Sequence, residues 1–320
     1  MNLLVDPLIR VETSEGMTEM SLPALLESLG QDRVERLPGL QLHQEDPFHV
    51  FLTSLATAIL ARDNKSDPVQ TEGYWLEGLR KLASSAGDDA WTLVVDDLSR
   101  PAFMQPPLPA KDHEKLSLTA ATPDALDVLQ TAKNHDVKAA RAIRPHADNW
   151  IYALVSLQTM SGFLGRGNYG ISKMNSGFGN RSIVELVRST RPGRRWQDAV
   201  VRLLPHRESL LNDVYGYRSD GLVLVWVEPW DGSTSLRLSN LDPVYIEICR
   251  RIRLRGRGGT ISHADAVPAQ TERIAAKELK GVVGDAWLPV DLGDRDTAEP
   301  KALTVSPQGL TPDLLRRIVF

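Results

Sequence analysis

The sequence has little of what marks a secreted, membrane-bound or zinc-stapled protein. Its single cysteine, Cys249, excludes an intrachain disulfide and any zinc site built from several cysteines. No apolar run reaches the roughly 18 residues that a membrane span needs. Acidic Asp6 stands where a signal peptide would carry a basic region. We therefore expect a cytoplasmic protein that contacts no membrane and holds no metal or other cofactor.

Repeats, heptads and low-complexity tracts are also missing, and strand and helix signals do not alternate regularly. This irregular order argues against a doubly wound parallel sheet. Helices are expected at 21–29, 46–62, 75–82, 122–130, 150–163, 196–204 and 311–319, and strands at 2–11, 91–95, 222–227, 244–254 and 280–290. Residues 182–188 suit a strand or a short helix. We expect an irregular α+β fold, with several short sheets and helices in one large domain over residues 1–320.

The charge is unevenly distributed along the chain, whose net charge is −4. Residues 1–60 carry nine acidic and three basic side chains, whereas residues 161–218 carry ten basic and four acidic ones. The acidic end is expected to be solvated or to face a protein. The basic middle is the better candidate for contact with a polyanion.

The most unusual stretch is residues 161–182, which hold six glycines interleaved with basic, amide and aromatic side chains. Glycine lets the backbone turn at positive φ and lets another molecule approach closely. Arg166, Asn168 and Lys173 supply hydrogen-bond donors for phosphates or base edges. The pattern favours a nucleic-acid contact, and the alternative is a surface loop without function.

Gly165, Gly167 and Gly170 also spell the G-x-G-x-x-G of dinucleotide-binding proteins. That motif needs a strand before it and a helix N-terminus after it. Here a buried helix is expected before it, and further glycines follow. The context therefore argues against a dinucleotide site.

Five arginines fall between positions 250 and 257. In a strand, Arg251, Arg253 and Arg255 would share one face with Arg257. We expect this face either to be merely solvated or to follow a phosphate backbone.

Enzymatic signals are weak. His135 and Asp136 are similar to the paired ligands of HD-type metal phosphohydrolases, so a metal-dependent phosphohydrolase or nuclease is the alternative function. A protein-only scaffold, in which the basic loop is incidental, is a third.

Several segments together resemble the CasA family, the large subunit of the type I-E CRISPR complex Cascade. They are MNLLVDPLIRV at the N-terminus, PAFMQ at 101–105, the glycine-rich loop, LDPVYIEI at 241–248 and the segment 301–320. The resemblance implies a non-catalytic subunit that reads the protospacer-adjacent motif of double-stranded DNA from the minor groove and promotes R-loop formation. Its implied partners are the Cascade subunits that carry the crRNA, the target DNA and a recruited helicase–nuclease.

The resemblance also assigns residues to these contacts. It places Gly165 to Gly170 in the minor groove, and it matches a family lysine to Lys277, with Lys280 second. Anchoring on the guide RNA and the neighbouring subunit would fall to the loop before the buried helix, with Lys133, Asn134, His135 and Lys138. The family continues into a glutamine wedge and a four-helix bundle that this sequence does not contain. We therefore expect the chain alone to bind DNA weakly.

Overall fold

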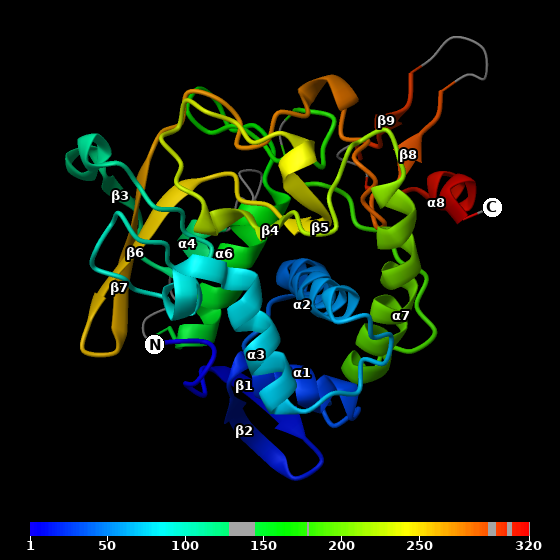
Figure 1. Ribbon diagram of the computed structural model, residues 1–320, viewed down its shortest axis with the longest axis horizontal. Coiled ribbons are helices and arrows are strands. Elements are labelled where there is room, and N and C mark those ends of the chain that lie inside the picture. Colours follow the sequence, from blue (N-terminus) through cyan, green and yellow to red (C-terminus); the bar gives the residue numbers. More distant parts are fainter. Residues whose placement is uncertain (128–144, 178, 294–298, 306–308, 320) are drawn as a thin grey trace.

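The computed structural model describes residues 1–127, 145–177, 179–293, 299–305 and 309–319. Its helices and short, separate sheets confirm an irregular α+β fold (Figure 1). The helices are α1 (Leu22–Gly30), α2 (Leu42–Arg62), α3 (Glu72–Ala83), α4 (Pro123–Leu126), α6 (Ala147–Met160), α7 (Pro192–Leu211) and α8 (Pro312–Val319).

The strands form small sheets rather than one large one. They are β1 (Ile9–Thr13), β2 (Gly16–Met20), β3 (Ser117–Ala120), β4 (Leu222–Leu224), β5 (Leu241–Ile246), β6 (Arg251–Arg257), β7 (Thr260–Val267), β8 (Val290–Asp291) and β9 (Lys301–Ala302). The antiparallel order β3-β7-β6 makes the three-stranded sheet, and β1–β2 and β8–β9 are antiparallel pairs. Strands β4 and β5 pair in parallel.

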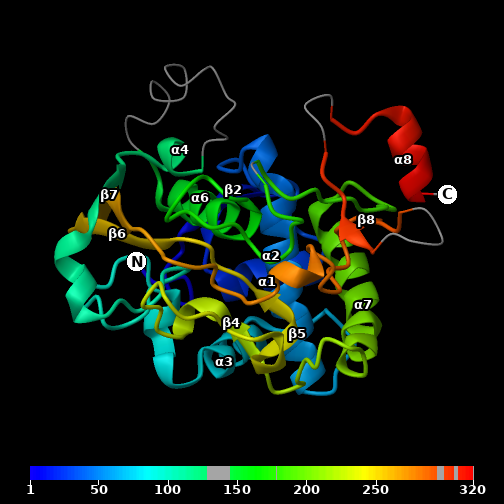
Figure 2. The same cartoon turned by 90° about the horizontal axis from the view of Figure 1, so that it is seen from above.

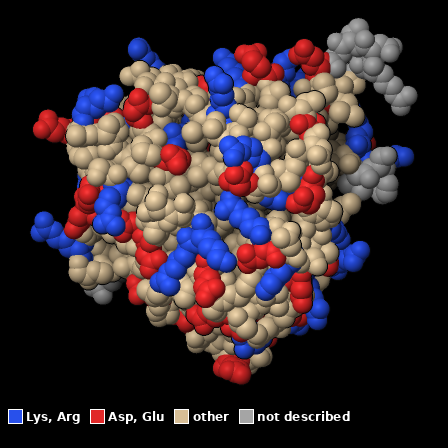
Figure 3. All heavy atoms as spheres, viewed as in Figure 1, with Lys and Arg blue, Asp and Glu red and all other residues tan. Residues whose placement is uncertain are grey.

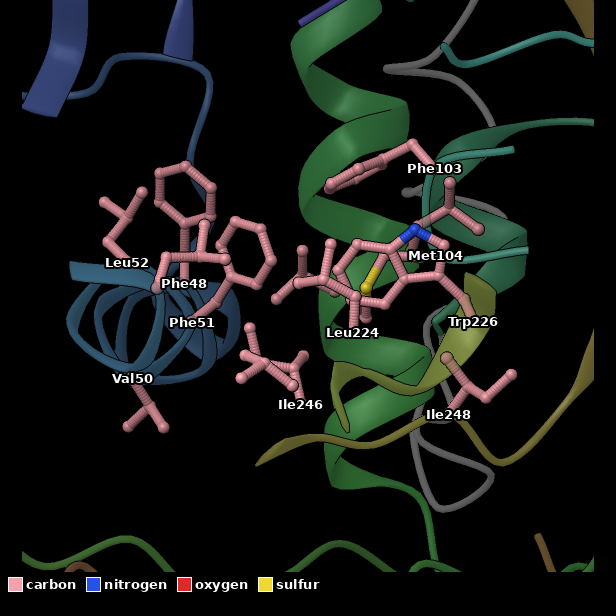
Figure 4. Close-up of a cluster of buried hydrophobic side chains, with 14 of the residues drawn as sticks. Phe48, Val50, Phe51, Leu52, Phe103, Met104, Leu224, Trp226, Ile246 and Ile248 are labelled. Atoms are coloured by element: carbon pink, nitrogen blue, oxygen red, sulfur yellow. The ribbon is translucent and has the colours of Figure 1, made fainter. Parts of the chain in front are cut away.

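Helix α2 lies at the centre of the core and packs against α6, α7, α3 and β5 (Figures 1 and 2). Its aromatic side chains begin a chain of edge-on contacts across the molecule: the ring of Phe51 lies 5.8 Å from that of Phe103, which lies 5.9 Å from Trp226 (Figure 4). The ring of Phe48 meets Tyr152 of α6 edge-on at 4.8 Å. Such pairs add to the burial of large apolar surface. The packing fixes α6, whose C-terminal end leads directly into the glycine-rich stretch.

The start of the central helix differs from expectation. Asp46 and Pro47 suggest a first turn there, but α2 begins at Leu42, because Gln41 and Gln44 form a reciprocal cap. The carboxylate of Asp46 instead accepts a hydrogen bond from Arg195 of α7 at 2.8 Å. Asp46, which local rules predict to cap the helix, thus bonds to a residue far away in the sequence instead.

Several expected strands are shorter than predicted or not formed. Residues 244–254 divide between β5 and β6, because the backbone between them bonds to Gln158 of α6. Residues 182–188 form neither strand nor helix, 280–290 contribute only Val290, and 91–95 contribute one isolated bridge at Thr92.

Candidate nucleic-acid interface

The glycine-rich stretch, residues 161–182 and here called the glycine loop, leaves the C-terminal end of α6 and folds back on itself. The N–H of Gly162 donates to the carbonyl of Gly179, and the N–H of Phe163 to that of Gly177, each at 2.8 Å. Ser161 pairs with Asn180 in an isolated antiparallel bridge. These bonds close the base of the loop, and its outer part lies against the segment after β7, where the N–H of Ala269 donates to the carbonyl of Gly167 at 2.9 Å.

The outer turn, residues 164–168 and here called the loop tip, is closed by its own backbone. The N–H of Leu164 donates to Asn168 at 2.9 Å, and the N–H of Asn168 donates to Gly165 at 3.0 Å. Arg166 and Asn168 are exposed, and neither side chain has a hydrogen-bond or ion-pair partner within the described part of the chain. The tip therefore presents two unused sets of donors on an ordered turn.

The three glycines of G-x-G-x-x-G have different structural roles. Gly165 has φ of +101° with open space where a Cβ would lie, whereas Gly167 has φ of +90° and a Cβ there would meet Pro268 at 2.7 Å. A Cβ on Gly170 would lie 2.9 Å from the backbone of Phe163. Gly170 is thus required by the packing of the loop on itself, and Gly167 by its contact with Pro268, independently of any ligand.

One side of the loop borders a groove of about 390 Å³. Its walls are Phe163, Tyr169 and Gly170 of the loop, and the segment from Glu272 to Lys277 opposite. Lys277 is exposed and lines this groove, so the two parts of the chain that the resemblance singled out lie together. Lys280 lies three residues on, where its Nζ is 2.6 Å from a carboxylate oxygen of Glu299.

Lys173 does not face a ligand, contrary to its assignment as a DNA contact. Its side chain is buried, and Nζ lies 3.2 Å from both Asp285 and the carbonyl oxygen of Tyr245. Burial lowers the pKa of Lys173, and the charge of Asp285 opposes this shift. An ammonium that is already enclosed by protein groups cannot reach a phosphate.

The solvent-facing arginine track is likewise wrong for two of its three members. Arg251 is buried and donates to the carbonyl oxygens of Trp230 at 3.1 Å and Pro268 at 3.0 Å, as well as to Asp112. Arg253 is 1% exposed and donates to backbone carbonyls, one of them Leu98 at 2.8 Å.

Burial lowers the pKa of Arg253 to about 10. Arg255 is half-buried and bonds to Asp265 at 2.8 Å, whereas Arg257 is exposed. The segment 98–112 covers Arg251 and Arg253, and a shift of register between Arg255 and Gly256 interrupts the strand alternation before Arg257.

Two buried charged residues next to this strand were missed as contributors to the loop. Arg250 donates to the carbonyls of Gly162 and Tyr169, and Glu247 accepts from the N–H and the hydroxyl of Ser172. The available signal was a charge inside an apolar segment, YIEIC, whose cost of burial demands a partner.

The proposed anchoring residues Lys133, Asn134, His135 and Lys138 lie outside the described residues, as does Asp136 of the phosphohydrolase alternative. Across the ranges that the structure describes, no three histidine, cysteine or acidic side chains are grouped to hold a metal ion. No helix within those ranges has both the length and the apolar character that a bilayer crossing requires.

Comparison with solved structures identifies the architecture. A CasA from Thermus thermophilus superposes with a TM-score of 0.53 at 15% identity, over 96% of this chain and 58% of that one. The fold is CasA-like. A second Thermus thermophilus structure, of CasA (Cse1), gives a TM-score of 0.50 at 15% identity, over 98% of this chain and 64% of the other. The chain thus spans about three fifths of the length of these CasA structures, and the resemblance seen in its sequence is confirmed at the level of the fold. No family model and no curated protein matches the sequence.

Proposed function

We propose that this chain is a non-catalytic DNA-recognition subunit of a guide-RNA CRISPR complex. It reads a short protospacer-adjacent motif in the minor groove of double-stranded DNA and promotes R-loop formation. The CasA-like fold supports this proposal, because the loop that the resemblance assigned to the minor groove forms a hydrogen-bonded turn with two exposed donor side chains. Its partners are the Cascade subunits that carry the crRNA, the target duplex and a recruited helicase–nuclease. The region 131–139 is proposed as the anchor on the guide and the neighbouring subunit.

The observation that carries the proposal is the loop tip. Arg166 and Asn168 are exposed beside Gly165. Gly165 has no side chain, and no other group occupies the space around its Cα where one would lie. The minor groove is about 6 Å wide and offers acceptors at every base pair, so a slim turn with guanidinium and amide donors suits it. Lys277 faces the adjoining groove and supplies a cation for the neighbouring phosphates. In this division of labour the protein reads only the short motif, and base pairing with the guide reads the rest.

Alanine substitutions at the tip test this function directly. In the reconstituted complex, Arg166→Ala and Asn168→Ala should each reduce discrimination between motif and non-motif DNA by about 1–3 kcal/mol, the usual contribution of a good base-edge contact. Folding should be unchanged, because neither side chain has a polar partner among the described residues. Binding is measured by titrating the complex into labelled duplexes that differ only in the motif.

Arg33→Ala is the matched control. Arg33 is also exposed and has no side-chain partner within the described residues, but it lies in the turn after α1, far along the chain from the loop. The substitution removes one positive charge and should therefore lower the affinity slightly and equally for every duplex. Unchanged discrimination in both tip variants would refute the assignment of the loop.

A further inference from the structure

The glycine loop is attached to the body of the protein by the ion pairs of Lys173 and Arg181 with Asp285 and by the bond from Ala269 to Gly167. Two buried charged side chains from the segment between β5 and β6 add further contacts to the backbone on both sides of the tip. We propose that Arg250 and Glu247 are positioning residues, which hold the two stems of the loop so that its tip is presented in one fixed geometry for motif reading. This inference rests on the proposed function for what the tip reads. The fixing of the loop itself can be measured without DNA.

Arg250 joins the stems on both sides of the tip. Its Nη2 donates to the carbonyl of Gly162 at 3.1 Å, and Nη1 donates to the carbonyls of Tyr169 and, at 3.0 Å, Cys249. Gly162 comes before the tip and Tyr169 follows it, so one planar guanidinium spans the turn. A guanidinium offers five donors in a rigid fork, and this makes it suited to linking two carbonyls at a set separation.

Arg250 is itself held by α6. The side-chain oxygen of Gln158 accepts from the N–H groups of Cys249 at 2.9 Å and Arg250 at 2.8 Å, while its amide donates to the carbonyl of Arg250 at 3.0 Å. The same amide donates to Met104 at 2.8 Å. The guanidinium is therefore mounted on a helix that the core packing holds in place.

Glu247 holds the stem that follows the tip. One carboxylate oxygen accepts from the N–H of Ser172 and the other from its hydroxyl, each at 2.7 Å. The Ser172 hydroxyl lies 2.7 Å from the hydroxyl of Tyr245, so it too is fixed in place. Glu247 is 3% exposed, and both of its carboxylate oxygens accept hydrogen bonds from the single loop residue Ser172.

Neither charge is neutralised by a direct ion pair among the described residues. Arg250 is 7% exposed and bonds only to carbonyl oxygens, while Lys173 and Arg181 near Glu247 pair with Asp285 instead. Burial raises the pKa of Glu247 to about 7, and the hydrogen bonds from Ser172 oppose this rise. Burying a charge without a counter-charge is costly, and an apolar residue would serve the core better. What these side chains provide is orientation of the loop.

The test compares local and global effects. Hydrogen exchange of the peptide over 161–172 in the isolated protein should be at least about tenfold faster in Arg250→Ala and Glu247→Ala, since the amides of Leu164 and Asn168 then open with the stems. Glu247→Gln keeps an acceptor for the Ser172 N–H and should restore most of the protection. Should Arg250→Ala fail to fold, Arg250→Lys keeps the charge without the fork and should give the same local change.

The control is Asp242→Asn, which weakens the buried contacts between Arg207 and Asp242 at 2.6 and 3.0 Å, at the start of β5 and away from the bonds to the loop. It should destabilise the protein without selectively exposing the loop. In the reconstituted complex, the two alanine variants should lose motif discrimination to the extent of Arg166→Ala, and Asp242→Asn should keep it.

Two measurements, loop exchange and motif discrimination, separate three outcomes. Loop exchange in the alanine variants no faster than in Asp242→Asn would overturn the positioning role, whatever the DNA result. Fast loop exchange together with a wild-type complex that shows no motif preference would uphold the fixing of the loop and refute the proposed function. Fast loop exchange with unchanged discrimination in both alanine variants would refute the link between them.

Discussion

Single glycine positions in the loop differ in what they tolerate, although the motif makes them look equivalent. Gly165 and Gly167 both have positive φ, but only Gly167 lies against another segment, where Ala269 also donates its N–H to the Gly167 carbonyl at 2.9 Å. At the tip of the loop, Gly165 thus faces open space, whereas Gly167 packs against Pro268.

Alanine at the two positions should separate these roles. We expect Gly165→Ala to lower the free energy of unfolding by about 1–2 kcal/mol, the cost of a side chain at an unfavourable φ. Gly167→Ala should cost roughly 1 kcal/mol more, because its Cβ also overlaps Pro268. Urea denaturation of both variants measures the difference, and equal costs would contradict the contact.

The arginines of β6 differ as strongly as the glycines. Arg251→Ala should lower the free energy of unfolding by on the order of 3 kcal/mol, because it leaves Asp112 buried without this partner and frees two carbonyls. Arg257→Ala, at an exposed site of the same strand, should change it by less than about 0.5 kcal/mol. Chemical denaturation of the two variants measures both changes.

The same two variants also test whether β6 binds DNA. If Arg251 contacted phosphates, its loss would flatten the dependence of DNA affinity on salt. We expect an unchanged salt dependence for any Arg251 variant that remains folded.

At the scale of elements, the glycine loop, β5 and the segment around Asp285 meet in a buried polar cluster. Asp285 accepts from Arg181 at 3.0 Å and lies 3.2 Å from Lys173, and although burial alone would raise the pKa of Asp285, these two charges lower it to about 2. Glu247 in the same cluster has its pKa raised to about 7. Two carboxyl groups in one cluster therefore prefer opposite protonation states.

The raised pKa of Glu247 predicts a specific pH dependence of stability. In the unfolded chain Glu247 ionises near 4.5, so between there and about 7 the folded state binds the extra proton. Stability from this group is present below pH 4.5 and is lost as the pH rises to about 7, a change of roughly 3 kcal/mol. The glutamine in Glu247→Gln cannot ionise, so this variant should not lose stability in this way as the pH rises.

The measurement is the difference in unfolding free energy between Glu247→Gln and wild type at a series of pH values. The difference should grow in favour of Glu247→Gln by roughly 3 kcal/mol from about pH 4.5 to about 8 and then level off. Parallel profiles would show that Glu247 titrates normally. Groups that do not interact with Glu247 cancel in this difference, whereas Lys173 and Tyr245, which face Glu247, are electrostatically coupled to it.

At the scale of the whole molecule, basic and acidic side chains are interspersed on the face shown in Figure 3. The face shown in Figure 3 has no continuous basic surface. Near the loop, the exposed or half-exposed cations of the described chain are Arg166, Lys277 and Lys280, and Lys280 is paired with Glu299. With so few cations near the loop, we expect tight binding of DNA to need phosphate contacts from other subunits as well.

The isolated chain should therefore bind duplex DNA weakly and with a shallow salt dependence. Release of counterions from about two phosphates, one for each unpaired cation, gives a log–log slope of roughly −2, against a much steeper slope for a complex that adds its own backbone contacts. Fluorescence anisotropy between about 50 and 200 mM salt measures both slopes. Tight, motif-specific binding by the isolated chain would contradict this expectation.

The sequence by itself determined the class of fold, the central helices and the loop. Ser21 caps α1, Thr311 precedes α8, and the apolar pattern around Trp150 forms α6, because these signals act over a few neighbouring residues. The glycines of the loop were also readable, since few other residues adopt positive φ.

Only the tertiary structure decided which charges face solvent. Alternation in a strand places Arg251 and Arg253 on one face, but whether that face meets water or protein depends on distant segments near Leu98 and Asp112. For the same reason the sequence predicts a ligand contact at Lys173, although Asp285 lies beside it in the fold. The sequence shows which residues carry a charge. Long-range packing decides which group each charge bonds to, and therefore whether it can contact a ligand.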